Sequence, residues 1–112
     1  MTSKQLIAKL NHSAQPFADV MAVIDKEYMF TPAAFSNGEQ RNDAGTNNGS
    51  CKIFAFGLLH QLSEQAILNA FGDFYIKDVL ENPAGVDHAN IRDFMRSGWK
   101  GIRFESKALR RK

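Results

Sequence analysis

The chain has 112 residues, a formal net charge of +2, an apolar content of 44% and a charged content of 23%. This length fits one domain over residues 1–112, and the apolar content is too high for a disordered chain. The longest apolar run, Ile53 to Leu59, is too short to cross a membrane as a helix, so we expect no membrane association.

The cysteine content and the two termini point to a soluble cytoplasmic protein. A single cysteine, Cys51, cannot form an internal disulfide, so no oxidising compartment is required. The N-terminus lacks the apolar stretch of a cleaved signal peptide. Residues 107–112 form a basic tail, which is typical of a solvated terminus. We therefore do not expect nucleic-acid binding.

The first quarter of the chain predicts two helices. A short helix begins at Ser3, a good capping residue, and ends near Asn11. A second begins at Pro16 and ends near Lys26. Its apolar residues recur at the i, i+3, i+4, i+7 spacing of one buried face: Phe17, Val20, Met21 and Ile24.

An extended segment and a long polar loop are expected next. Tyr28 to Thr31 favours a strand, because it is rich in aromatic residues and Pro32 forbids a regular helix there. Between Ser36 and Ser50 most residues are turn formers, and the pairs Asn37-Gly38 and Asn48-Gly49 predict two tight turns. A loop of this length in a small domain is often functional or mobile.

The next stretch is expected to be helical. Ser50 can cap a central buried helix with Cys51 in its first turn, because apolar residues surround the helix axis almost completely. Two shorter helices should follow, with Ser63 and Asp73 as their caps. A last helix is expected to begin at Asp87.

The C-terminal part predicts a helix end and a strand. Gly98 should end the last helix in a left-handed conformation and place Trp99 against Phe94. Ile102 and Phe104 alternate with charged residues, as in a half-buried strand that could pair with the strand at Tyr28. The predicted fold class is α+β, helix-dominated, with a small sheet formed by strands near 28–35 and 100–105.

Several blocks of the sequence, in one register over residues 30–109, resemble a known family. They are Phe30-Thr-Pro, Phe35-Ser-Asn-Gly38, Ala44-Gly45, Asn47, Gly49-Ser-Cys-Lys52, Phe54-Ala-Phe56, Asp78-Val-Leu80, Asp87-His88, Asn90-Ile-Arg92 and Gly98-Trp99-Lys-Gly-Ile102. With these blocks the chain resembles the HopJ type III effector family.

The resemblance implies a small bacterial protein with a compact mixed α/β fold. No biochemical activity is established for this family, and its name comes from an association with type III secretion in plant pathogens. It therefore implies a protein of the bacterial cytoplasm that a type III system could export. It supplies no catalytic residues, so candidate sites rest on their own chemistry.

Cys51 is the first candidate site residue. The positive end of a helix dipole and the neighbouring Lys52 would both favour its reactive thiolate. A cysteine hydrolase or transferase would need His88 as base and Asn90 or Asp87 to orient it. The alternative is that Cys51 is a small buried apolar residue and that Asp87 only caps a helix.

The polar loop is the second candidate, as a surface that binds a protein partner. Its residues would be Asn37, Asn42, Asn47 and Asn48, with Arg92 on the adjoining helix. The alternative is that these asparagines only build turns. Nothing in the sequence indicates a cofactor, and the three histidines lack the spacing of a metal site. Whether the protein is an enzyme stays open at this level, with partner binding as the leading hypothesis.

Overall fold

The computed structural model describes all residues from Met1 to Lys112. In chain order the elements are α1 (Ser3–Leu10), α2 (Phe17–Glu27), β1 (Tyr28–Phe30), β2 (Phe35–Asn37), β3 (Gln40–Asn42), α3 (Asn48–His60), α4 (Glu64–Asn69), the π-helix η1 (Phe74–Val79), α5 (Ala89–Ser97), the 3-10 helix η2 (Gly98–Gly101), β4 (Ile102–Phe104) and β5 (Leu109–Arg111). This is the expected α+β class with helices dominant.

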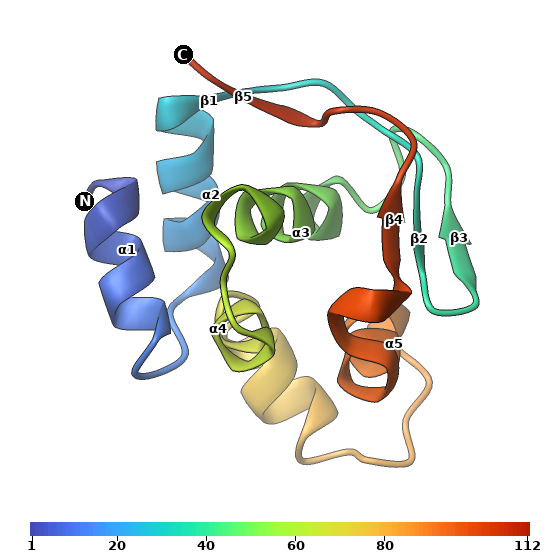
Figure 1. The fold of residues 1–112 in the computed structure, drawn as a ribbon. Coiled ribbons are helices and arrows are strands. Elements are labelled where there is room, and N and C mark those ends of the chain that lie inside the picture. The colour runs from blue at the N-terminus through green and yellow to red at the C-terminus, as the bar shows by residue number, and fades with distance from the viewer.

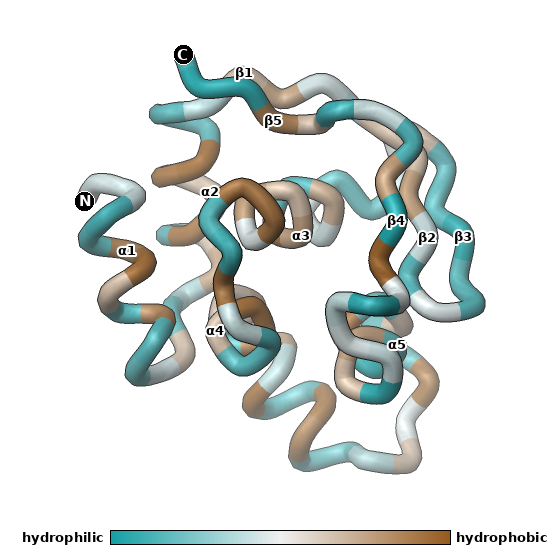
Figure 2. Tube along the Cα trace, viewed as in Figure 1, coloured by the Kyte–Doolittle hydropathy of each residue, from teal (hydrophilic) through white to brown (hydrophobic).

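Helix α3 lies at the centre of the molecule (Figure 1), with α1 and α2 on one side and the β3-β2-β4 sheet on the other. The expected burial around its axis holds only for the first part of the helix: Cys51, Ile53, Phe54, Ala55, Phe56 and Gly57 are buried, whereas Leu58 and Leu59 are 48% and 45% exposed. Figure 2 shows hydrophobic residues gathered where α2, α3 and α4 meet. Burial of these side chains is the main force that holds the helices together.

Phe54 of α3 is the centre of an aromatic cluster. Its ring centroid lies 5.1 Å from that of Phe94, 5.8 Å from that of Phe35 and 5.9 Å from that of Phe71. Trp99 packs edge-on against Phe94 at 5.2 Å, which confirms the contact expected after the last helix. One side chain thus joins the sheet to α5 and to the segment that follows α4.

The strands pair differently from the expectation. The strand Ile102–Phe104 pairs with Phe35–Asn37 and not with the strand at Tyr28. Tyr28–Phe30 pairs instead with Leu109–Arg111, inside what was expected to be a solvated tail. A buried Tyr28 explains this pairing, because its hydroxyl accepts a hydrogen bond from Arg111 at 2.7 Å and lies 2.5 Å from His60 Nε2.

The starts of two helices also differ from the expectation. Thr2 caps α1, while Ser3 is buried and bonds to Glu27. Asn48-Gly49 is not a turn but the first turn of α3, so Ser50 is not its cap. The other Asn-Gly pair does form a turn, since Gly38 has φ +62° between β2 and β3.

The close approach of α3 to α4 and η2 depends on Gly57. A β-carbon at this position would clash with Ile67 and lie 2.7 Å from the Trp99 ring. We expect Gly57→Ala to lower the free energy of unfolding by about 1–2 kcal/mol, because overpacking costs about 1–3 kcal/mol against a gain of at most about 1 kcal/mol in helix propensity. Urea denaturation measures this change. The control Leu59→Ala, at an exposed position of the same helix, should change stability much less; an equal loss in both variants would contradict the packing argument.

Candidate functional site

A cleft of about 350 Å³ lies between the N-terminal ends of α3 and α5. Its apolar lining comes from three aromatic side chains and one aliphatic side chain: Phe17, Phe71, Phe74 and Ile91. The other lining residues come from the two helix ends and the β3 strand: Gln40, Asn47, Gly49, Ser50, His88, Ala89 and Asn90. The cleft brings together parts of the two sequence blocks expected to carry function.

The α3 wall of the cleft is set by an unusual helix start. Asn47 precedes the helix in the left-handed region, with φ 49° and ψ 46°, and its side chain does not cap the helix. Its amide instead donates to Asn42 Oδ1 at 2.8 Å. The Phe17 ring approaches Gly49 so closely that a β-carbon there would lie 2.7 Å from its Cζ atom. Asparagine and glycine are residues that allow these two backbone positions.

Three buried asparagines join the β2–β3 hairpin to α5. Asn90 Nδ2 donates to Asn42 Oδ1 at 2.9 Å, and Asn37 Nδ2 donates to the Asn90 carbonyl oxygen at 2.8 Å. Asn37 and Asn42 are 0% and 1% exposed, so they cannot touch a partner on the surface. Of the loop asparagines proposed for recognition, only Asn47 and Asn48 are exposed.

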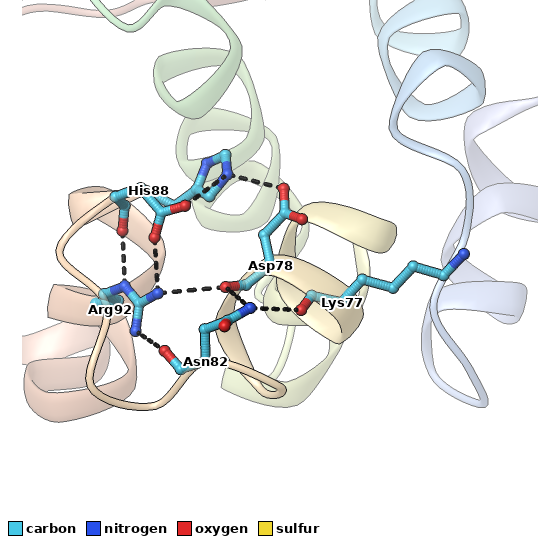
Figure 3. A network of polar contacts seen from close by, with 6 residues as sticks. Lys77, Asp78, Asn82, His88 and Arg92 are labelled. Carbon is cyan, nitrogen blue, oxygen red and sulfur yellow. Dashed lines mark hydrogen bonds and ion pairs between the residues drawn. The ribbon is translucent and has the colours of Figure 1, made fainter.

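Arg92 holds the segment before α5 in place (Figure 3). Its guanidinium donates to the backbone carbonyls of Asp87 and Asn82 at 2.7 and 2.8 Å, to that of Asp78 at 3.3 Å, and to Asp87 Oδ1 at 2.8 Å. The Arg92 side chain is only 8% exposed. These contacts make Arg92 an internal clamp and not the surface binding residue that the sequence suggested.

His88 faces the cleft from the α5 side. It precedes the helix in the left-handed region, with φ 51°, so it replaces Asp87 as the N-cap residue. Its Nε2 lies 3.0 Å from Asp78 Oδ2 and 3.8 Å from Asp87 Oδ2. The hydrogen bond from Arg92 holds the pKa of Asp87 below its usual value, so this carboxyl stays ionised.

Asp78 is the acidic partner of His88 that sequence reasoning missed. It lies in η1, where the π-helical turn presents Phe74 and Asp78 to the same imidazole; the Phe74 and His88 ring centroids are 5.2 Å apart. Of the expected orienting residues, Asp87 lies near His88 at the longer distance, while Asn90 bonds to other asparagines. A π-helix is often found at functional sites, but no residue pattern in the sequence predicted one at this position.

Cys51 lies outside the cleft and inside the core. It is 1% exposed, and its thiol donates to the Ala33 carbonyl oxygen at 3.6 Å. Burial raises the pKa of the Cys51 thiol, and the Lys52 charge only partly offsets this effect. The expectation of a lowered thiol pKa is therefore wrong, because the thiol is desolvated in the core. No contact joins Cys51 to His88.

The cleft offers hydrogen-bond donors that the chain itself leaves unused. No acceptor in the protein pairs with the backbone N–H groups of Gly49 and Ser50 in α3 or of Ala89 and Asn90 in α5. The first N–H groups of any helix lack intrahelical partners, and here no side chain caps them. The cleft therefore combines an apolar floor with donors from two walls.

Two further findings concern metals and membranes. No three His, Cys, Asp or Glu side chains are grouped so that they could hold a metal ion. None of the helices combines the length and apolarity needed to cross a bilayer.

We expect folded protein to resist iodoacetamide at Cys51 until it unfolds, because the thiol is buried and its pKa is raised. Alkylation followed by mass spectrometry across pH 6–10, with and without urea, measures this. An apparent midpoint below the usual value of about 8.5 in the folded protein would contradict the burial argument.

We expect Arg92→Ala to lower the free energy of unfolding by about 2–4 kcal/mol, because it removes several charged hydrogen bonds. Arg96→Ala, which removes a 69% exposed side chain from the same helix, should cost less than about 1 kcal/mol. Thermal or urea unfolding compares the two. Similar losses in both variants would show that the clamp carries no special weight.

The comparisons with known proteins agree on one relationship. Residues 3–109 match the model of the family described as HopJ type III effector protein. A crystal structure of VPA0580, a protein of unknown function, is 54% identical in sequence, with a TM-score of 0.96 over 100% of this chain and 95% of that chain. A search among curated proteins gave no match. On its sequence, its fold and the match over nearly its whole length, the chain belongs to the HopJ type III effector family.

Proposed function

We propose that this protein is a type III effector that acts by binding a protein partner, and that the cleft between α3 and α5 receives a segment of that partner. Membership of the HopJ family supports the effector role. On this proposal the protein is made in the bacterial cytoplasm and exported through a type III system. The single observation that carries the binding site is the cleft with its two donor-bearing walls.

The size and lining of the cleft favour part of a peptide as the ligand. Ligand sites commonly occupy about 300–1,000 Å³ and combine apolar walls with a few fixed polar groups. The present cleft reaches the lower part of this range. An apolar side chain of the partner would pack on Phe17 and Phe74, and its neighbouring carbonyl or carboxylate groups would accept from Gly49, Ser50 and Ala89.

The rigidity of the site favours binding with little rearrangement. Asn47 is bonded to Asn42, and the residues before α5 are clamped by Arg92, so both walls are already ordered. A preorganised site avoids the entropic cost of ordering loops on binding. The cysteine-dependent hydrolase receives no support from this geometry, because Cys51 neither lines the cleft nor contacts His88.

The proposal is tested by filling the cleft. Purified protein is used to select binders from a peptide display library, and binding of the enriched peptides is measured by fluorescence anisotropy. We expect Ala89→Trp, which places a large ring in the cleft, to weaken binding at least about tenfold. This loss corresponds to about 1.4 kcal/mol.

Ala22→Trp is the matched control, because Ala22 is exposed on α2 and does not line the cleft. It should leave the affinity unchanged. Amide chemical shifts should move on peptide binding at residues 47–51 and 88–91. Equal affinities for the two variants, or shifts confined to another face, would overturn the cleft as the binding site.

A further inference from the structure

The Asp78–His88 pair has the arrangement of a general base. The Nε2 atom lies 3.0 Å from Asp78 Oδ2, and the tautomer that donates to this carboxylate from Nε2 has Nδ1 as its proton acceptor. No group of the protein forms a hydrogen bond with Nδ1 (Figure 3). The side chain is 29% exposed and lines the cleft, so a bound molecule can reach it.

The surroundings of His88 hold the imidazole ring in place. Phe74 packs on one side of the imidazole, and the carboxylates of Asp78 and Asp87 both face Nε2. Arg92 binds the backbone carbonyls of Asp78 and Asp87, which holds the two backbone segments together. A charge that develops on the ring would be stabilised by the nearby carboxylates.

Ser50 is the nucleophilic side chain that lines the same cleft. Its hydroxyl forms no hydrogen bond within the protein, and it lies in the first turn of α3. Its own N–H and that of Gly49 are free, as are those of Ala89 and Asn90 on the facing wall. Backbone N–H groups at a helix start can stabilise an oxyanion formed beside them.

We propose that the cleft is an acyl-transfer site for ester substrates, with Ser50 as nucleophile, His88 as general base and Asp78 as the residue that positions His88. Ser50 Oγ attacks the ester carbonyl carbon while its proton passes to His88 Nδ1. The intermediate collapses, the carbon–oxygen bond to the leaving group breaks, and the alcohol leaves with the proton from His88. Water, deprotonated by His88, then releases the acid and frees Ser50.

This proposal does not rest on partner binding, and a small reagent tests it separately. Diisopropyl fluorophosphate forms a phosphorus–oxygen bond to an activated serine and loses fluoride, and the serine proton passes to the base. We expect one adduct per chain, located at Ser50 by tandem mass spectrometry. Ser50→Ala should abolish the adduct, while Ser106→Ala, at an exposed serine outside the cleft, should not.

The role of His88 is tested by His88→Gly. Glycine adopts the left-handed backbone of His88 without strain, so the start of α5 should be retained. We expect labelling to slow about 10²–10⁴-fold, as for the loss of a general base, and added imidazole to restore part of the rate. A purely structural role of His88 would not give this rescue.

The role of Asp78 is tested by combining the two substitutions. Asp78→Asn should slow labelling in the wild-type background and have no further effect in His88→Gly, because Asp78 acts only through the ring. Circular dichroism checks that each variant is folded. Absence of any adduct on folded wild type, or labelling of Ser50 at the same rate in His88→Gly, would overturn the proposal.

Discussion

The hydrogen bonds between Asn90 and Asn42 hold the β2–β3 hairpin against the first turn of α5, and both walls of the cleft depend on them. Asn42 Oδ1 accepts from Asn90 on one wall and from Asn47 on the other, at 2.9 and 2.8 Å. An amide oxygen buried in this way is costly to leave unpaired, so the two walls are coupled through a single side chain. The loop that looked like a recognition surface is, at its base, the support of the cleft.

Two residues of the cleft walls have a positive φ, which is an energetically unfavourable backbone conformation. Asn47 and His88 both adopt the left-handed region immediately before a helix, and such non-glycine backbone conformations cost about 1–3 kcal/mol each. In each case tertiary contacts compensate: Asn47 bonds to Asn42, while His88 bonds to Asp78 and packs on Phe74. Both strained residues line the cleft, which is where strain kept for function is usually found.

The sequence predicted the buried faces of the helices well, because these depend on residue spacing. It predicted helix starts and strand pairing poorly where these depend on contacts with residues far away in the chain. The stripe on α2 and the burial of α3 up to Gly57 were predicted correctly from helical spacing, whereas Leu58 and Leu59 at the end of α3 are exposed. The helix start at Ser63 was also predicted correctly, but those at Ser3 and Asp87 were not, since Asp87 bonds to Arg92 and Ser3 to Glu27. The partner of the Tyr28 strand was also missed, because three-residue strands contain too little pattern to fix their pairing.

The same distinction applies to the candidate site: single residues could be identified from the sequence, but their partners and their burial could not. His88 could be singled out as a titratable group, but its partner Asp78 lies ten residues earlier, on a π-helix that no propensity predicts. Cys51 attracted attention through its place in the first turn of a helix, yet burial reverses the effect of that position on its pKa. A reactive group is defined by its solvation as much as by its neighbours in the chain.

The two walls of the cleft suit different tasks. The α3 wall, built on Asn47 and Gly49, offers backbone donors and has no ionisable group among the lining residues. The α5 wall contains His88, the one titratable side chain that lines the cleft, with its acids clamped by Arg92. The proposed binding uses backbone donors from both walls and the apolar floor, whereas the proposed chemistry also depends on the His88 side chain and its orientation by Asp78. A HopJ protein that kept the asparagine network but lost Asp78 could therefore still bind a ligand while it lost any reaction that depends on the orientation of His88.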